Sequence, residues 1–381
     1  MIQRELEKII TKNLNEYPAV ALIGSRQVGK TTLAKTLSDV YYDLESEEEK
    51  LRLDFQWDDI LQSDKPIVLD EAQNYPEIFP RLKVAIDRNR EKNGRFLLLG
   101  SVSPSLMKDV SEFLTGRIAL CHLYPLSVTE LNQKLSDTLW LLGGYPDGGI
   151  LDKNKFPSWQ QNYLDLLAMR DLPTWGLPAK PQVTKRFFKM LSALHGQIWN
   201  ASQLGKSLGL NYHTVNTYLD YLEHVFLIRK IQPFFTNVKK RFLKSPKVYW
   251  MDSGLHHALA GILSMEQLLE QPWVGSSWEG WIIEQILVFL NNRGIHFDGP
   301  YYLRTSDGYE LDLILIIEGK LWAIEIKLTS TPGRDDTVKL QHVGSLINAN
   351  KLVLISRTTR IIEKDNLFSC SLSHLLDILV K

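Results

Sequence analysis

The segment GSRQVGKT, residues 24–31, constrains the fold of this chain more than any other stretch. It follows the apolar run AVALI and continues into TLAKTL, which has helical character. A glycine-rich loop between a strand and a helix directs backbone N–H groups at phosphate oxygens, and the helix adds the positive end of its dipole. This order of elements predicts a phosphate-binding loop (P-loop), and we expect its ligand to be ATP.

The residues of this loop have separate expected tasks. Gly24 and Gly29 let the backbone approach the phosphates closely. Lys30 reaches the β and γ phosphates and takes part in catalysis, while the Thr31 hydroxyl ligates Mg²⁺. The predicted nucleotide-binding residues are Gly24, Ser25, Arg26, Gln27, Val28, Gly29, Lys30, Thr31 and Thr32.

Two acidic residues end a second apolar strand, PIVLDEAQ at residues 66–73. At the carboxyl edge of a parallel sheet, Asp70 is placed to hold Mg²⁺ and Glu71 to polarise the attacking water. Without the P-loop, the same letters would suit a strand that simply enters a loop. Beside it, they predict a Mg²⁺-dependent ATPase.

Two further residues have open interpretations. Ser101 ends the strand FLLLGS, where it either senses the γ phosphate or caps the next helix. Arg117, in LTGR, is either an arginine finger, acting within the chain or on a neighbouring subunit, or an exposed structural arginine. A role in trans would make the protein a homo-oligomer.

Strands alternate with helical stretches up to about Leu131, which is typical of an α/β fold with a parallel, doubly wound sheet. Because 381 residues exceed what one hydrophobic core usually serves, further domains are expected. Three helical stretches with a turn at Gly209 and two following strands predict a winged helix-turn-helix. We therefore predict an ATPase domain at 1–135, a helical connector at 136–185, the winged helix at 186–252 and a second α/β domain at 253–381.

Composition limits the partners of the chain. Lys plus Arg and Asp plus Glu balance at 44 each, so any site for nucleic acid must be local. We expect no signal peptide, because acids lie among the apolar residues of the N-terminal segment, and no membrane span, because no apolar run is long enough. Cys121 and Cys370 are far apart and predict neither a disulfide framework nor a zinc site. A cytoplasmic protein is expected.

Several motifs together resemble a family of prokaryotic AAA+ type P-loop ATPases. They are GSRQVGKTTL, VLDEAQ, LLLGS, LTGR followed by YPLSVTEL, and later GGYP and the MRDL of residues 169–172. The resemblance spans nearly the whole chain. It implies an ATPase core, then a winged helix, then a C-terminal domain of unknown function with nuclease-like motifs.

A local basic cluster follows the expected recognition helix, whose exposed stripe we place at His213, Asn216, Thr217 and Asp220. The cluster comprises Arg229, Lys230, Lys239, Lys240, Arg241, Lys244 and Lys247, without an intervening acid and with Phe234, Phe235 and Phe242 interleaved. Cations with aromatic rings between them suit DNA. The alternative is a solvated wing, or a surface for the acidic segment 43–59.

The C-terminal domain carries paired carboxylates. GYELD places Glu310 and Asp312 on one face of a strand, and EIK does the same for Glu325 and Lys327 on the next. If the hairpin turns tightly at residues 318–319, Asp312 lies opposite Glu325 and all four share a face. A three-residue loop would separate them.

On one face, Asp312 and Glu325 would form a Mg²⁺ site, and Lys327 would orient the attacking water. The element order resembles the PD-(D/E)XK nuclease fold, of the restriction-endonuclease-like class, which implies Glu279, Asp312, Glu325 and Lys327 as site residues. The alternative is a salt-bridged strand pair in a domain that no longer cleaves.

The preferred hypothesis is an ATPase that acts on or with DNA through the winged helix and the nuclease-like domain. One alternative is an ATP-gated switch that binds a protein partner and keeps an inactive nuclease-like scaffold. Another is a DNA-binding regulator in which ATP is only structural.

Overall fold

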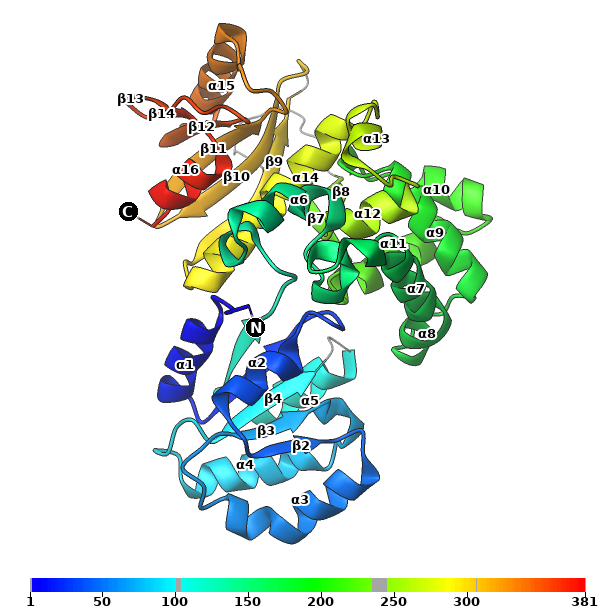
Figure 1. The fold of residues 1–381 in the computed structure, drawn as a ribbon, viewed down its shortest axis with the longest axis vertical. Coiled ribbons are helices and arrows are strands. Elements are labelled where there is room, and N and C mark those ends of the chain that lie inside the picture. Colours follow the sequence, from blue (N-terminus) through cyan, green and yellow to red (C-terminus); the bar gives the residue numbers. More distant parts are fainter. Residues whose placement is uncertain (1, 101–103, 235–244, 306, 381) are drawn as a thin grey trace.

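The computed structural model describes residues 2–100, 104–234, 245–305 and 307–380. In Figure 1 the chain forms a lower body, which contains the first sheet, and an upper body with all later elements. The predictions for Ser101, for Phe235 and Phe242, and for Lys239, Lys240, Arg241 and Lys244 lie outside the described residues.

The lower body is built on a five-stranded sheet in the order β2-β3-β4-β1-β5. All its strand pairs are parallel, and β1, β3 and β4 are buried throughout, as expected for strands covered on both faces. The predicted doubly wound parallel sheet is thus confirmed. Its strands are β1 Ala19–Ile23, β2 Tyr41–Asp43, β3 Ile67–Asp70, β4 Phe96–Gly100 and β5 Ile118–His122.

Helices flank this sheet, and one of them is the acidic segment. Helix α3 begins after Ser46, whose hydroxyl accepts a hydrogen bond from the N–H of Glu49. Its first turn contains three glutamates, whose negative charges interact favourably with the positive end of the helix dipole. Most of the acidic segment is therefore part of helix α3. The helices are α1 Glu7–Glu16, α2 Lys30–Leu37, α3 Glu47–Ile60, η1 Ala72–Asn74, α4 Ile78–Arg88 and α5 Pro104–Leu114.

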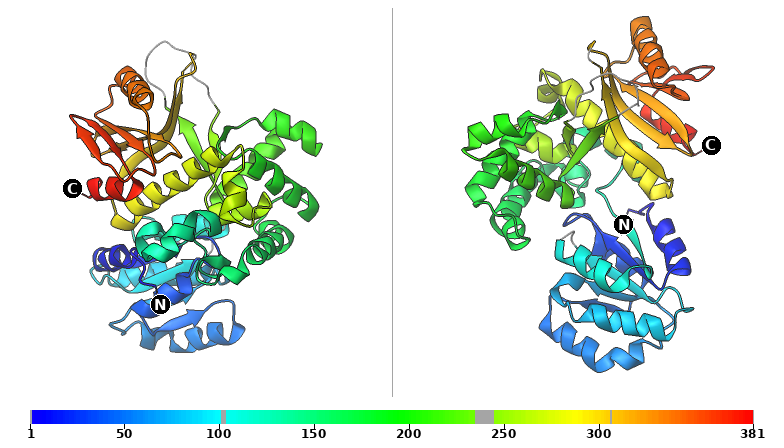
Figure 2. Two further views of the ribbon diagram at one scale, coloured as in Figure 1. Left: turned by 45° about the horizontal axis from the view of Figure 1, so that its top comes forward. Right: turned by 180° about the vertical axis from the view of Figure 1, so that it is seen from behind.

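The upper body begins with short helices and then three longer ones with an antiparallel sheet. The first set is η2 Val128–Glu130, α6 Gln133–Leu142, η3 Pro146–Ile150, η4 Lys153–Lys155, α7 Ser158–Leu166, η5 Leu167–Asp171 and α8 Leu172–Thr174. The second set is α9 Pro181–Ala193, β6 Gln197–Ile198, α10 Ala201–Leu208, α11 Tyr212–His224, β7 Ile228–Pro233 and β8 Lys247–Trp250. Figure 2 shows this helical part and the C-terminal strands on opposite sides of the upper body.

The last part of the chain completes a mixed nine-stranded sheet in the order β13-β14-β12-β11-β10-β9-β7-β8-β6. The parallel pairing of β7 with β9, through Gln232 and Tyr301, joins the two parts of the upper body into this single sheet. The remaining elements are α12 Ser253–Leu259, α13 Met265–Leu269, α14 Val274–Arg293, β9 Phe297–Arg304, β10 Glu310–Ile317, β11 Lys320–Ile326, α15 Arg334–Leu346, β12 Lys351–Ile355, β13 Ile362–Lys364, β14 Leu367–Cys370 and α16 Leu372–Ile378.

The hairpin between β10 and β11 has the tight turn on which the carboxylate prediction depended. Ile317 pairs with Lys320, and Glu318 and Gly319 between them have φ of 51° and 73°. Two successive positive φ values are typical of a type I′ turn. The same register pairs Leu313 with Ile324. It therefore sets Asp312 opposite Glu325, as predicted.

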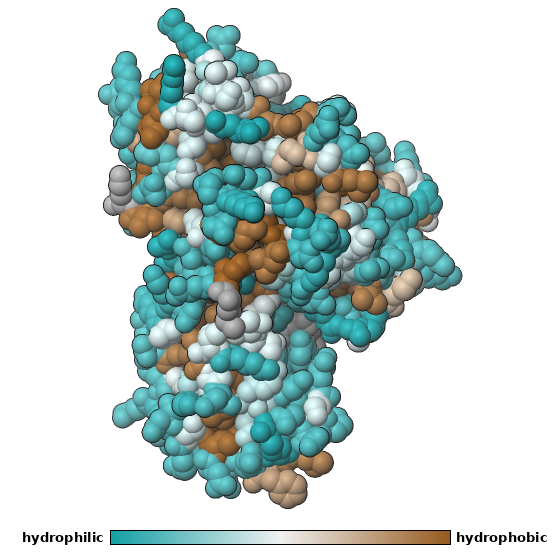
Figure 3. Space-filling view, viewed as in Figure 1, coloured by the Kyte–Doolittle hydropathy of each residue, from teal (hydrophilic) through white to brown (hydrophobic). Residues whose placement is uncertain are grey.

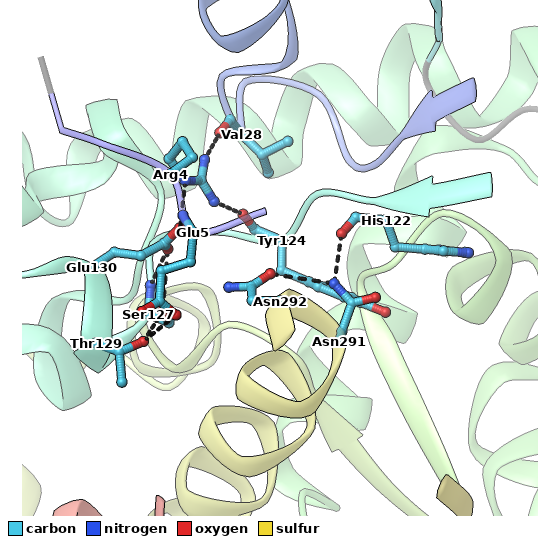
Figure 4. A network of polar contacts seen from close by, with 10 residues as sticks. All are labelled: Arg4, Glu5, Val28, His122, Tyr124, Ser127, Thr129, Glu130, Asn291 and Asn292. Carbon is cyan, nitrogen blue, oxygen red and sulfur yellow. Dashed lines mark hydrogen bonds and ion pairs between the residues drawn. The ribbon is translucent and has the colours of Figure 1, made fainter. Parts of the chain in front are cut away.

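A hydrophobic cluster continues from the lower body into the upper body, and polar contacts around the N-terminal segment add to it. Figure 4 shows Arg4 between three partners: it donates to the carbonyls of Val28 (2.8 Å) and Tyr124 (2.6 Å) and to Glu130 (2.9 Å). From helix α14, the Asn291 amide donates to the carbonyl of His122, which ends β5. In Figure 3, apolar residues are visible at the waist between the bodies.

Across the described ranges, no helix is both long and apolar enough to span a membrane.

Candidate functional site

The P-loop joins β1 to α2 in a conformation that depends on its glycines. A Cβ atom on Gly24 would lie 2.3 Å from the carbonyl oxygen of Leu123, so only glycine fits there. Gly29 has φ of 96° and ends the loop as the N-cap of α2. Gln27 also has positive φ, at 63°. A left-handed non-glycine residue costs free energy and is typical of a loop shaped for a ligand.

Lys30 points back into this loop. Its ammonium donates to the carbonyls of Gly24 and Ser25, both at 3.0 Å, and its side chain is buried. Burial lowers the pKa of Lys30 to about 8, an effect that the nearby Glu71 and Asp70 carboxylates oppose. Phosphate oxygens would be stronger partners for this ammonium than the two carbonyls.

This pKa predicts that ATP binding takes up protons in mildly alkaline solution. Above pH 8 the free protein holds Lys30 largely neutral, whereas bound phosphates favour the ammonium form. We expect ATP affinity to fall as pH rises through 8 and on towards 9. Calorimetry at pH 8.5 in two buffers of different ionisation enthalpy measures the uptake. Absence of proton uptake, with unchanged affinity at pH 9, would contradict the prediction.

Asp70 and Thr31 meet at the start of α2. The Thr31 hydroxyl donates to Asp70 Oδ2 at 2.6 Å, and the Tyr41 hydroxyl donates to the same oxygen at 2.7 Å. The N–H of Glu71 donates to Asp70 Oδ1 at 2.9 Å. A hydroxyl and a carboxylate in contact are oxygen donors that suit Mg²⁺, whose further ligands are phosphates and water. The residues present therefore fit the metal that a P-loop implies.

Glu71 follows Asp70 in a left-handed conformation, with φ of 51°. The Gln73 amide donates to Glu71 Oε2 and fixes the carboxylate. Burial raises the pKa of Glu71, while the Lys30 ammonium acts in the opposite direction. A raised pKa at a strained backbone position is typical of a residue that handles a proton.

A cleft of about 1060 Å³ opens beside this site, between the two bodies. The P-loop and the segment from Ile2 to Arg4 line one side, and residues of the upper body line the other. Across the cleft, Arg26 pairs with Asp171 at 3.0 Å and lies over the Trp175 ring at 5.4 Å. The lining residues of the upper body are Pro146, Asp147, Leu151, Arg170, Asp171, Thr174 and Trp175.

Two tyrosines add to this contact. The hydroxyl of the buried Tyr145 donates to Ser25 Oγ at 2.9 Å. The Tyr163 hydroxyl donates to the carbonyl of Arg26 at 3.3 Å. The upper body therefore contacts two consecutive residues of the P-loop, Ser25 and Arg26. The contacts to Arg26 reach both its side chain and its backbone carbonyl.

Arg117 lies away from this site. Its carbonyl accepts a hydrogen bond from the N–H of Ala19, the first residue of β1. The P-loop follows Ile23, the last residue of β1, so Arg117 lies at the opposite end of this strand. Its guanidinium pairs with both carboxylate oxygens of Asp87, at 2.9 and 3.0 Å. The expectation of an arginine finger within the same chain is therefore wrong for this structure. Action on a neighbouring copy stays a prediction.

The C-terminal carboxylates do come together, but with an additional cation. Lys247, from β8, lies 3.1 Å from Glu279 Oε1 and 3.9 Å from Asp312 Oδ1. The Tyr249 hydroxyl also donates to Glu279 Oε1. Glu325 Oε1 is paired with Lys327. We call these six residues, Lys247, Tyr249, Glu279, Asp312, Glu325 and Lys327, the carboxylate cluster.

The carboxylate cluster does not fit the Mg²⁺ site predicted for it. Asp312 Oδ2 accepts the N–H of Ile326 at 2.8 Å, and its other oxygen faces Lys247. Burial, then the charge of Asp312, raises the pKa of both Glu279 and Glu325. Within the described residues, no group of three or more His, Cys, Asp or Glu is placed to hold a metal ion.

The described members of the basic cluster are already paired with acids. Arg229 makes a bidentate contact with Glu284 of α14, and Lys230 contacts Asp220 and Glu223 of α11. Lys247 lies in the carboxylate cluster. On the expected recognition helix, His213, Thr217 and Asp220 are exposed as predicted, but the half-buried Asn216 accepts a hydrogen bond from Trp199.

Several residues at these sites were not found from the sequence. Tyr145 and Asp171 belong to the GGYP and MRDL motifs, but those motifs gave no partner for them. Lys247 was expected only in the basic cluster, and its two-residue spacing from Tyr249 in KVYW, which places both on one face of β8, is the only local signal for the carboxylate cluster. Arg4 has no local signal, because its partners are far away in the sequence.

Three domain families match consecutive parts of the chain. Residues 16–132 match the family described as AAA domain. Residues 133–266 match a domain of unknown function, DUF8612, and residues 274–375 match another, DUF4143. Together with the P-loop geometry, the first match identifies the lower body as an AAA domain of the P-loop ATPase type, which implies nucleotide binding.

Among whole proteins, similarity extends over most of the chain. The uncharacterized protein Rv2008c of Mycobacterium tuberculosis is 36% identical over 335 residues, 87% of this chain and 75% of that protein. Mb2031c of Mycobacterium bovis gives the same values. An uncharacterized protein of Haemophilus influenzae is 21% identical over 94% of both chains. The solved Walker-type ATPase PABY2304 of Pyrococcus abyssi is 16% identical, covering 68% of this chain and 96% of that one with a TM-score of 0.45, a likeness too low to bear on function.

Proposed function

This chain belongs to the family of the mycobacterial proteins Rv2008c and Mb2031c and contains an AAA domain. We propose that it is a Mg²⁺-dependent ATPase whose upper body responds to the nucleotide bound at the P-loop. In this proposal Thr31 and Asp70 would hold the metal, which would supply positive charge next to the phosphates. Lys30 binds the phosphates, and Glu71 takes the proton of the attacking water.

The main observation behind this proposal is the ion pair between Arg26 and Asp171. Arg26 is part of the loop that surrounds the phosphates, and its partner lies in the upper body with a side chain only 6% exposed. Arg26 Nε is buried and has no hydrogen-bond partner among the described residues. A phosphate group arriving in the loop would compete with Asp171 for this guanidinium. Nucleotide binding would then weaken or shift one of the contacts that position the upper body.

We expect Asp171→Asn to uncouple the two bodies from the nucleotide. Dyes on Asp58→Cys in α3 and Lys339→Cys in α15 would report the distance between the bodies by energy transfer; both positions are exposed, and the native cysteines are buried. ATP should change the transfer efficiency in the parent and have at most a small effect in Asp171→Asn. The matched control is Asp165→Asn, which removes a surface pair with Lys185. A full ATP response in Asp171→Asn would refute the role of this contact.

Nucleic acid is the second candidate partner. The order α9, β6, α10, α11, β7, β8 supports a winged helix-turn-helix, whose second helix reads base edges through exposed residues such as His213 and Thr217. The pairing of Arg229, Lys230 and Lys247 with acids reduces the charge available for phosphates. ATPase rates with and without short duplex or single-stranded DNA separate the candidates. Stimulation favours DNA, and indifference favours a switch that binds a protein.

A further inference from the structure

The ammonium group of Lys247 lies between two carboxylates that come from different elements. Glu279 belongs to α14 and Asp312 to β10, and the ammonium is 3.1 Å from an oxygen of the first and 3.9 Å from an oxygen of the second. The side chains of all three residues are at least 86% buried, since their exposed fractions are 6%, 14% and 10%. We propose that this tethered ammonium closes the carboxylate cluster to divalent metal ions.

The position of Lys247 is fixed by its strand. In β8, Lys247 and Tyr249 are two residues apart and therefore point to the same side, where both contact Glu279 Oε1. Strand β8 is hydrogen-bonded to both β6 and β7, so its backbone is held on two sides. The ammonium is thus a built-in part of the cluster, unlike a surface lysine that adopts many positions.

A metal ion and this ammonium compete for the same oxygens. Mg²⁺ binds carboxylate oxygens at about 2.1 Å, so an ion that joined Glu279 to Asp312 would have to lie where the ammonium now lies. Two positive centres in a buried site repel each other strongly, because the local dielectric constant is low. Lys327 meanwhile neutralises Glu325 on the other side of the cluster. Without any metal ion, the cluster therefore already contains two ammonium groups, those of Lys247 and Lys327, for its three carboxylates.

This arrangement has a consequence for the nuclease-like character of the domain. Metal-dependent hydrolysis needs the ion in contact with the acidic residues. While Lys247 keeps its place, the domain acts as a scaffold. Removing the charge of Lys247, with the carboxylates unchanged, should open a metal site that the natural chain lacks. The inference is independent of the proposed ATPase cycle, because it concerns the nucleotide-free protein.

The test is Mn²⁺ binding to the full chain without nucleotide, measured from the loss of the free-ion signal in electron paramagnetic resonance. Asp70→Asn serves as the parent, since it removes the metal-binding carboxylate of the P-loop site. We expect Lys247→Met in this parent to bind one more Mn²⁺ per chain than the parent does. Adding Asp312→Asn should abolish the gain, and Lys247→Arg, which keeps a cation in place, should show none.

Two results would overturn the proposal. One is Mn²⁺ binding by the parent that Asp312→Asn removes, because the cluster would then be open with Lys247 present. The other is a folded Lys247→Met protein with no gain. Circular dichroism and thermal melting establish that the variant is folded. If Lys247→Met does not fold, Lys247→Gln, which is neutral but can still donate to Glu279, is judged by the same two criteria.

Discussion

Glu71→Gln is expected to lower the ATPase turnover by about 10²- to 10⁴-fold and to leave ATP affinity nearly unchanged. Glutamine has the size of glutamate and can still accept the hydrogen bond from Gln73, so the turn after β3 should be preserved. It cannot take a proton from the attacking water. The loss corresponds to about 3–5 kcal/mol of activation free energy. Phosphate release gives kcat, and calorimetry gives the dissociation constant of ATP.

The matched control for this variant is Glu48→Gln, which makes the same chemical change on the exposed face of α3. Its turnover should equal that of the natural chain. An unchanged kcat in Glu71→Gln would remove Glu71 from the catalytic step. A large loss of ATP affinity with little change in kcat would assign it to binding instead.

Arg229→Met is expected to cost about 3–5 kcal/mol of folding free energy, because it leaves the Glu284 carboxylate buried without its cation. The Glu284 side chain is 4% exposed, and Arg229 contacts both of its oxygens. Arg229 also lies 6.0 Å from the Tyr124 ring, so the pair stands where β7, α14 and the lower body meet. Urea unfolding followed by circular dichroism should show an earlier transition.

Two further variants show whether the unpaired charge is the cause. Arg229→Met combined with Glu284→Gln removes the buried charge and should recover much of the loss. Lys230→Met, on the neighbouring position of β7, breaks pairs with the more exposed Asp220 and Glu223 and should cost less than about 1 kcal/mol. Equal losses at Arg229 and Lys230 would mean that burial of the partner does not decide the effect.

The sequence predicted those features whose causes are local. The P-loop, the strand that ends at Asp70, and the parallel sheet follow from short patterns in which each residue acts on its neighbours. The register of β10 and β11 was also predictable, because a two-residue turn fixes all later pairs.

Charge pairing was not predictable in the same way. Arg229, Lys230 and Lys247 were interpreted as a basic surface because no acid lies between Arg229 and Lys247 in the sequence. Their acids lie on other elements: Asp220 and Glu223 on the preceding helix α11, and Glu279 and Glu284 on α14, which only the tertiary fold brings near. Arg26 and Asp171 are likewise 145 residues apart. A net charge counted along the chain therefore overestimates the charge that a surface offers to DNA.

The parallel pairing of β7 with β9 also determines whether the upper body can be produced as two separate fragments. Both strands lie in the interior of the nine-stranded sheet, each hydrogen-bonded on two sides. A chain cut between residues 252 and 274 would leave one free strand edge on each fragment, and exposed edges promote aggregation. The two halves are therefore expected to be soluble only when produced together, and gene fusions or domain exchanges that separate them at this boundary should fail.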